Sequence, residues 1–252
     1  HTLLSDSLFW KSLGNTGYMT LVGVPLAVGL ALVVALLLNQ NVRGISFYRT
    51  AVFLPTLVPP MVVTLLFLWI LNPNYGLLKV PFDAVGIQSP GWLADPAYSK
   101  LAILLMVLWG TTGQTAVITL AGLKDIPRQL YEAASIDGAG RWTKFQYITL
   151  PGLSPVIFYN VLTGVLFFIQ IFTQAFTATI GGSGGGGTGA ALGGPVNSTL
   201  MMSLHIYKVA FYNSRAGYAS MLSLVILVIS LLLALLFFRF ARRFVYYEFA
   251  GN

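Results

Sequence analysis

The 252-residue sequence contains no cysteine and few charges, because only 8% of its residues are Asp, Glu, Lys or Arg whereas 56% are hydrophobic. The absence of cysteine excludes a disulfide framework and thiolate metal sites. Soluble domains carry about 25% charged residues, so this composition indicates a protein embedded in a lipid bilayer. The net charge of +7 does not indicate nucleic-acid binding, because the basic residues lie in short loops between apolar runs rather than in one patch.

Ionisable groups are also missing from the long apolar runs. All seven acidic residues lie outside these runs, and no Lys, Arg or His lies deep within one. Ion-coupled transporters usually place such groups within the membrane, which argues against a secondary transporter. No glycine is followed by lysine, so the phosphate-binding pattern GxxxxGK[ST] is absent and ATP binding of that kind is not expected. The two histidines, His1 and His205, have no carboxylate at metal-ligand spacing, so neither a metal site nor histidine-based catalysis is predicted.

Five apolar runs reach the roughly 20 residues that a membrane span requires. Because backbone groups in hydrocarbon must bond internally, these runs predict helices. The predicted fold class is therefore all-α, a polytopic membrane protein with five visible transmembrane helices at Thr16–Leu38, Ala51–Leu71, Leu101–Leu123, Pro155–Ile180 and Tyr218–Phe240. Pro55, Pro59 and Pro60 interrupt the second run. A helix broken in this way either lines a cavity or is simply kinked for packing, and the sequence leaves both open.

The distribution of basic residues predicts the orientation. Nine of the 14 lysines and arginines fall on one side of the five spans, which makes that side cytoplasmic and places the C-terminus there. The N-terminal His1 is then outside without a signal-peptide pattern, so an earlier span is expected before it. The outer loops are expected at about 72–99 and 180–217. The second contains a glycine-rich stretch, Ile180–Pro195, interpreted as a flexible connection rather than a nucleotide-binding GxGxxG, since no strand precedes it.

The most polar stretch between two apolar runs lies in a cytoplasmic loop at about 124–151. Asp125 is expected to cap a short helix that begins near Pro127 and ends near Ile136. Gly138 and Gly140 are expected to bend the chain before a second short segment. Composition alone favours an interfacial amphipathic loop over a docking element.

The spacing within this loop is more specific than its composition. It contains E-A-A, three residues, G, nine residues and I-x-L-P, over positions 132–151. This pattern resembles the cytoplasmic "EAA" loop of the membrane subunits of bacterial ABC importers. In that family the loop is the coupling helix that seats in a groove on a separate ATPase subunit. The resemblance implies that the residues serving ATPase coupling are Glu132, Ala133, Ala134, Asp137, Gly138 and Trp142.

Other segments are similar to carbohydrate-importer permeases, most of all to the maltose and glycerol-phosphate A-type subunits: "FWKSLGNT", "FYRTAVFLPTLVPP", "LNPNYGLL", "LAGLKDIP" and "RRFVYYE". The resemblance implies the ABC type I importer permease fold over residues 1–252, as a single transmembrane domain whose first of six core helices is missing. It implies a transport subunit without enzymatic activity or cofactor of its own, since ATP and Mg²⁺ would bind a partner ATPase dimer. Further implied partners are a second, non-identical permease, an extracytoplasmic solute-binding protein and the lipid bilayer of a bacterial or archaeal plasma (inner) membrane.

Polar side chains within two apolar runs suggest a substrate path. The steps of four, three and four residues between Thr163, Phe167, Gln170 and Gln174 place them on one helical face. Polar groups in apolar helices also simply join helices, but amides and hydroxyls beside aromatic rings suit a sugar. The family resemblance then indicates Thr111, Gln114, Thr163, Phe167 and Gln170 as substrate contacts.

The predicted function is therefore that of the permease subunit of an ATP-driven importer, which moves a sugar, oligosaccharide or polyol by alternating access. The alternatives are a secondary transporter and a membrane assembly subunit that does not transport. The first is disfavoured by the lack of buried charges, and the second predicts that the polar residues of the path have no role in uptake.

Overall fold

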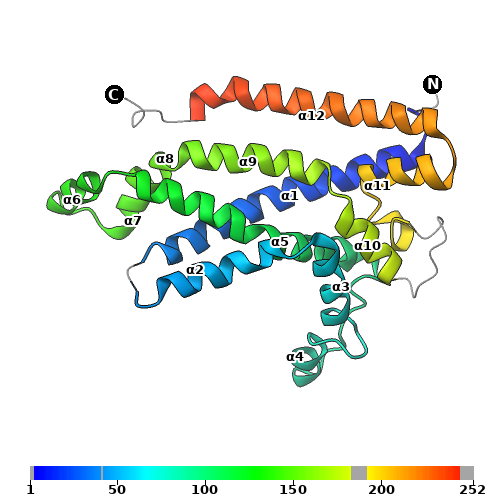
Figure 1. The fold of residues 1–252 in the computed structure, drawn as a ribbon, viewed down its shortest axis with the longest axis horizontal. Helices are drawn as coiled ribbons and strands as arrows, with labels where there is room; N and C mark the ends of the chain where they lie inside the picture. The colour runs from blue at the N-terminus through cyan, green and yellow to red at the C-terminus, as the bar shows by residue number, and fades with distance from the viewer. Residues whose placement is uncertain (1–2, 41, 183–191, 245–252) are drawn as a thin grey trace. The chain divides into compact units, whose positions relative to one another are not determined.

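The computed structural model describes residues 3–40, 42–182 and 192–244, with side chains through residue 240, and these residues form helices and no strand. Short 3₁₀ or π-helical turns join several of the helices. The α-helices are α1 (Ser7–Leu38), α2 (Ile45–Phe53), α3 (Pro60–Ile70), α4 (Lys79–Ala84), α5 (Pro96–Asp125), α6 (Arg128–Ile136), α7 (Arg141–Lys144), α8 (Leu150–Gly152), α9 (Ser154–Ile169), α10 (Thr173–Gly182), α11 (Met202–Tyr207) and α12 (Ala216–Phe244) (Figure 1).

Three of these helices, α1, α5 and α12, are each long and apolar enough to cross a membrane. Two more spans arise if each bent helix pair counts as one: α2 with α3, and the segment Arg141–Gly152 with α9. The predicted all-α polytopic fold is confirmed.

The second predicted span is broken rather than continuous. A 3₁₀ turn over Leu54–Leu57 follows α2, and α3 begins at Pro60. Proline is tolerated at the first position of a helix because its missing N–H has no intrahelical partner there. The prolines therefore separate two helices instead of kinking one.

The fourth predicted span, 155–180, is also two helices. The helix α9 ends at Ile169, and α10 begins at Thr173. The prediction that Thr163, Phe167, Gln170 and Gln174 share one helical face is consequently wrong for Gln170 and Gln174, which lie beyond the end of α9. No proline or glycine marks this break, so it is decided by packing rather than by local propensity.

The chain divides into two compact units. Unit 1 consists of His1–Val24, Val58–Gly110 and Val165–Leu231, and unit 2 consists of Pro25–Leu57, Thr111–Gly164 and Leu232–Asn252. The unit boundaries fall within α1, α5, α9 and α12, so these helices contribute residues to both.

In unit 1, two polar side chains attach the start of α1 to the segment before α11. Asn15 Nδ2 donates to the carbonyl oxygens of Asn197 and Leu200 at 2.9 and 3.0 Å, and Thr16 Oγ1 accepts from the amide of Met202 at 2.9 Å. Both side chains are buried, so bonding to backbone groups offsets the loss of their hydration. Met202 also belongs to an apolar cluster in this unit, whose other buried members are Phe9, Val209, Ala219 and Leu222.

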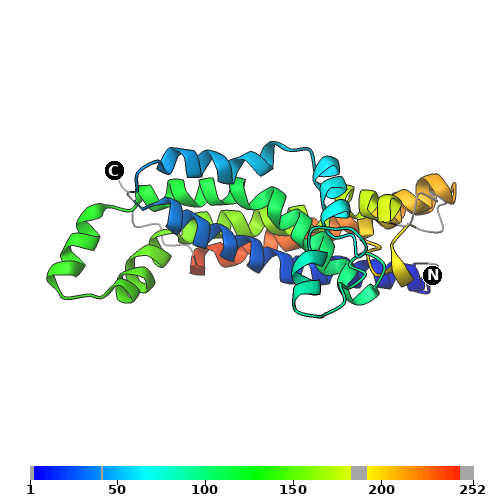
Figure 2. The same cartoon turned by 90° about the horizontal axis from the view of Figure 1, so that it is seen from below.

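In unit 2, the core is formed by Ala35, Leu38, Leu120, Leu123, Ile126 and Leu153. Small residues bring the helices close together. A Cβ atom added at Gly122 would lie 2.5 Å from Val156 Cγ2, and one at Gly152 would lie 2.9 Å from Ile126 Cδ1. Within this unit, α6 and α7 project beyond the adjoining ends of α5 and α9 (Figures 1 and 2).

Candidate coupling and transport sites

The helix–bend–helix predicted for the polar loop is present as α6, a bend at 137–140, and α7, which continues through a π-helical turn over Phe145–Thr149 into α8. We call the segment Arg128–Gly152 the polar hairpin. The expectation that Asp125 caps α6 is wrong. Asp125 is the last residue of α5, and α6 starts after Pro127 without a side-chain cap. Ile126, between them, is buried in the unit 2 core and holds the chain in place at this corner.

Gly138 determines the bend of the polar hairpin. Its φ angle is +77°, in the left-handed region that favours glycine. The amide of Gly138 donates to the carbonyl of Ser135 at 3.2 Å, and the amide of Ala139 donates to that of Ala134 at 2.8 Å. These bonds satisfy carbonyl groups at the end of α6, as in common glycine-terminated helices. Gly140, with φ −70°, is in an extended conformation open to any residue.

Hydrogen bonds join the two arms of the polar hairpin. The hydroxyl groups of Tyr131 and Thr149 lie 2.9 Å apart. Lys144 Nζ donates to Ser135 Oγ at 2.6 Å, and Ser135 Oγ donates to the carbonyl of Tyr131 at 2.7 Å. Tyr131 also packs against the unit 2 core. The hairpin is therefore a braced element joined to the helical core, rather than a loose connection.

Most of the predicted coupling residues are accessible. Glu132, Ala133, Asp137, Gly138 and Trp142 are exposed, and Ala134 is partly buried. The structure adds two residues that sequence reasoning missed, Ile136 at 87% exposure and Tyr147 at 71%. Their signal in the sequence is a large apolar side chain within an otherwise polar segment. Together with Trp142 at 72%, they are large apolar side chains that the hairpin leaves exposed.

Three of the predicted path residues, Thr111, Gln114 and Thr163, lie in unit 2 on α5 and α9. These helices are in contact, because Asn160 Nδ2 of α9 donates to Thr119 Oγ1 of α5 at 3.0 Å. Thr163 Oγ1 donates to the carbonyl of Tyr159 at 2.8 Å, which leaves its oxygen available as an acceptor. Sequence reasoning missed Asn160, although an amide inside an apolar run was a visible signal.

The other two predicted path residues, Phe167 and Gln170, lie in unit 1 where α9 ends. Phe167 is 42% exposed, whereas its neighbour Phe168 is buried. The ring of Phe168 packs so closely on Gly23 that a Cβ atom added at Gly23 would collide with it. Gln170 is exposed and follows the last residue of α9. The structure thus places Phe167 and Gln170 close together, and Thr111, Gln114 and Thr163 on two packed helices of unit 2.

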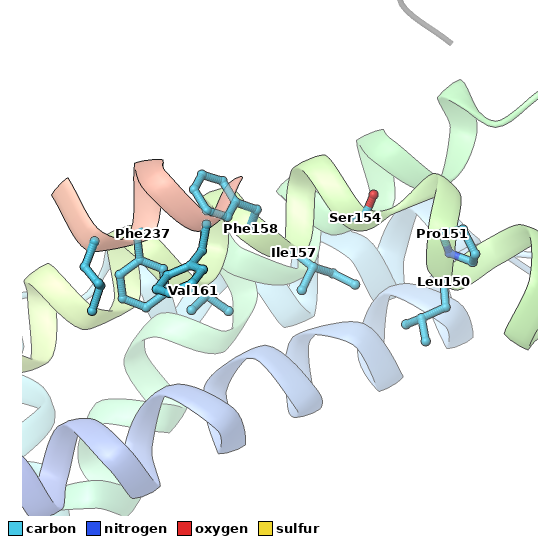
Figure 3. Close-up of a pocket in the computed structure, with 9 residues that line it drawn as sticks. Leu150, Pro151, Ser154, Ile157, Phe158, Val161 and Phe237 are labelled. Atoms are coloured by element: carbon cyan, nitrogen blue, oxygen red, sulfur yellow. The ribbon is translucent and has the colours of Figure 1, made fainter. Parts of the chain in front are cut away.

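Unit 2 also has an apolar groove of about 620 Å³ between α8–α9 and the end of α12 (Figure 3). Of its nine lining residues, only Ser154 has a polar side chain. Phe158 of α9 and Phe237 of α12 meet here with ring centroids 6.4 Å apart. The groove suits an acyl chain or an apolar helix, and it does not suit a hydrophilic solute.

The family of the binding-protein-dependent transport system inner membrane component matches residues 23–246, which is most of the chain. The chain belongs to this family. It is therefore a transport subunit that spans the inner membrane several times, and not an enzyme.

Several curated relatives of this permease cover nearly its whole length. The lactose transport system permease protein LacF of Rhizobium radiobacter is 34% identical over 95% of this chain and 78% of its own. The diacetylchitobiose uptake system permease protein NgcF of Streptomyces coelicolor is 32% identical over 94% of this chain and 67% of its own. The permease is also similar in structure to a chain of a bacterial ABC transporter involved in alginate import, with a TM-score of 0.79 and 22% identity over 96% of this chain and 82% of that one. This likeness confirms the predicted importer permease fold.

Proposed function

We propose that this permease imports a carbohydrate or related polyol, and that a separate ATPase dimer drives the transport through the polar hairpin. The observation that carries the proposal is the geometry of this hairpin. Gly138 holds its bend, hydrogen bonds brace its arms, and Trp142 and Ile136 are exposed on it. A braced projection with exposed apolar side chains is suited to docking on a partner protein, because little conformational freedom is lost when it binds.

The other partners would be a second, non-identical permease and an extracytoplasmic solute-binding protein. ATP and Mg²⁺ would bind the ATPase, with the polar hairpin and the C-terminus on the cytoplasmic side. A binding-protein-bound state is known for a structural neighbour, an alginate ABC transporter in complex with an alginate pentasaccharide-bound periplasmic protein. The positive-inside distribution of basic residues supports this orientation.

The carbohydrate class is supported by the chemistry of the predicted path and by the relatives. Hydroxyl and amide groups of Thr111, Gln114, Thr163 and Gln170 can bond sugar hydroxyls, and the exposed ring of Phe167 can contact the apolar face of a sugar. The relatives named for lactose and diacetylchitobiose transport handle solutes of this kind. Alternating access would expose the path first outward and then inward.

The test is uptake of radiolabelled disaccharides into proteoliposomes holding the complete complex. Uptake should require internal ATP and binding protein and should be stopped by vanadate. Uptake that resists vanadate and collapses with an ionophore would identify a secondary transporter instead. A complex that assembles but never transports would favour the assembly role.

The path is tested separately by Gln170→Leu, with Gln88→Leu as the control for replacing an exposed amide outside the predicted path and the polar hairpin. Loss of an amide partner from a desolvated site costs about 1–3 kcal/mol, so uptake at low solute concentration should fall roughly fivefold or more in Gln170→Leu. The complex should still assemble. Unchanged uptake kinetics would remove Gln170 from the path.

A further inference from the structure

Unit 1 contains a second cavity, of about 400 Å³, whose lining differs from that of the apolar groove. It lies among the end of α3, the following turn, the segment 91–94 and Gly181 of α10. Its lining combines aromatic rings with the amides of Asn72 and Asn74. Cavities of about 300–1,000 Å³ with a few polar groups among apolar ones are typical of small-molecule sites. None of the predicted path residues lines it.

The turn that forms one wall is closed by its own backbone. The amide of Gly76 donates to the carbonyl of Asn72 at 2.8 Å, and the amide of Leu78 donates to that of Ile70 at 3.2 Å. A side chain at Gly76 would collide with the carbonyl oxygens of Asn72 and Ile70. Asn72 Oδ1 accepts from the amide of Asn74 at 2.9 Å, so the side chain of Asn72 is held in place. Its Nδ2 group has no acceptor among the described residues and remains a donor for a ligand.

Two exposed aromatic residues form another part of the lining. Trp69 is 73% exposed and Tyr75 is 69% exposed, and their rings meet edge to face with centroids 6.4 Å apart. The buried Trp92 also lines the cavity, and its indole Nε1–H finds no acceptor in the described part of the chain. This nitrogen is shielded from solvent, so Trp92 contributes apolar surface to the lining rather than a hydrogen bond.

The charge of the lining indicates the ligand class. None of the 13 lining residues is charged. An ionic ligand would lose hydration here without gaining a counter-charge. Aromatic faces and amide donors without charge suit a molecule with apolar faces and many neutral hydroxyl groups.

We propose that this cavity is a second carbohydrate site, in which a ring of a neutral saccharide packs against Trp69 and Tyr75 and its hydroxyls bond to Asn72. The proposal rests on the carbohydrate class proposed above and adds a place and a charge preference. No residue of the predicted transport path lines the site, which combines the end of α3 with parts of the segment expected to form the first outer loop. Its role is to bind solute at the permease itself, independently of the solute-binding protein.

The test is saturation-transfer difference NMR on the complete complex in nanodiscs, without binding protein. The probes are lactose and N,N′-diacetylchitobiose, with digalacturonate as an acidic counterpart. Magnetisation should reach both neutral disaccharides but not digalacturonate. In Trp69→Ala/Tyr75→Ala, transfer should fall about fivefold or more, because the loss of aromatic contacts is worth on the order of 1 kcal/mol. Trp10→Ala, which removes a 52% exposed tryptophan elsewhere in unit 1, should keep the full signal.

Equal transfer in the native complex and the double variant, or none in the native complex, would overturn the proposal. Equal transfer to digalacturonate would overturn the charge preference. If the double variant does not assemble, the single variant Tyr75→Ala provides the test, since it changes only an exposed side chain. Magnetisation transfer that does not fall in this variant overturns the proposal. ATP-driven uptake by the same variants, measured in proteoliposomes with binding protein present, separates the two proposals. If the native complex shows no uptake but its magnetisation transfer falls in the Trp69 and Tyr75 variants, only the transport function is contradicted. If uptake is normal but the variants keep the native magnetisation transfer, only the second site is contradicted.

Discussion

At the scale of single residues, two glycines in the polar hairpin have different roles although they are two positions apart. Gly138 has φ +77° and Gly140 has φ −70°. A Cβ atom added at either position would meet nothing within 4 Å. Space is therefore equal at both sites, and only the backbone conformation distinguishes them. This makes the pair a clean test of whether the left-handed conformation matters.

We expect Gly138→Ala to destabilise the bend by about 1–2 kcal/mol, because an L-residue is strained in the left-handed region. Gly140→Ala should have little effect. Solute-stimulated ATP hydrolysis and ATPase retention in reconstituted complexes should fall in the first variant and not in the second. Equal values for both variants would show that the bend tolerates a side chain.

Another residue-scale feature is a group of polar side chains in unit 1, of which Ser12 and His205 are buried and Asp6 and Tyr218 are partly buried. Tyr218 OH donates to Asp6 Oδ2 at 2.7 Å, and Ser12 Oγ lies 3.3 Å from His205 Nδ1. Burial lowers the pKa of His205 below its ordinary value of 6.5. The negative charge of Asp6 raises this pKa without outweighing burial, and the positive charge of Lys208 lowers it further. Burial raises the pKa of Asp6, but the hydrogen bonds from Tyr218 and the amides of Leu8 and Phe9 outweigh it and leave that pKa below 3.8.

These shifts predict a pH dependence of folding. As the pH falls below about 6.5, the unfolded chain protonates His205 before the folded one does, so the free energy of unfolding decreases until the pH reaches the lowered folded pKa. Asp6 adds a separate loss of stability only below pH 3.8. Between pH 7.5 and 5, the melting temperature should fall in the native permease and should fall less in His205→Gln. The same fall in both would contradict this role of His205.

At the scale of secondary-structure elements, one hydrogen bond joins α5 and α9 inside unit 2. Asn160 Nδ2 donates to Thr119 Oγ1, and both residues are buried. Thr119 Oγ1 in turn donates to the carbonyl of Thr115, so removing Asn160 leaves the threonine satisfied as a donor. Between membrane helices, such bonds replace the hydrophobic driving force that lipid does not supply.

A double-mutant cycle with Asn160→Leu and Thr119→Val should give a coupling energy of about 0.6 kcal/mol, and at most about 1.7 kcal/mol. Thr115→Val is the matched control, because the Thr115 hydroxyl donates to the carbonyl of Thr111 within α5. Its coupling to Asn160→Leu should be near zero. Unfolding in mixed micelles provides the measurement, and equal coupling for both threonines would contradict a specific bond between the helices.

At the scale of the whole molecule, the polar hairpin is the surface proposed to meet the ATPase. Trp142 on the hairpin and Phe211 in unit 1 have the same exposure of 72%, so they present equally accessible aromatic rings in different units. A general effect of surface hydrophobicity would change both in the same way. A docking effect would be confined to Trp142.

Trp142→Ala should weaken retention of the ATPase about tenfold or more, since buried tryptophans at interfaces often contribute 2 kcal/mol or more. Phe211→Ala should keep the ATPase. Size-exclusion chromatography of purified complexes at decreasing concentration measures the difference. If Phe211→Ala releases the ATPase as readily, the polar hairpin is not the specific docking surface.

Much of this protein follows from local sequence. Lipid acts as the solvent for the apolar runs, and each run must satisfy its backbone internally, so spans and helices could be predicted from composition. The end of the first helix of the polar hairpin at Ile136 and the glycine bend after it are also local, because Gly138 alone supplies the required dihedral angles. The E-A-A spacing indicates the transporter class through its resemblance to the cytoplasmic loop of ABC importer membrane subunits.

Other features depend on which surfaces meet. No proline or glycine marks the helix break after Ile169. The helix α10 packs beside α3, although the two are separated by more than 100 residues in the sequence. Ile126 rather than Asp125 holds the corner before α6, because its side chain is buried in the unit 2 core. The cavity lined by Trp69, Tyr75 and Trp92 also needs Gly181 of α10 as part of its lining. Local propensity cannot encode these contacts, since their free energy arises from side chains that are distant in the chain and close together only in the fold.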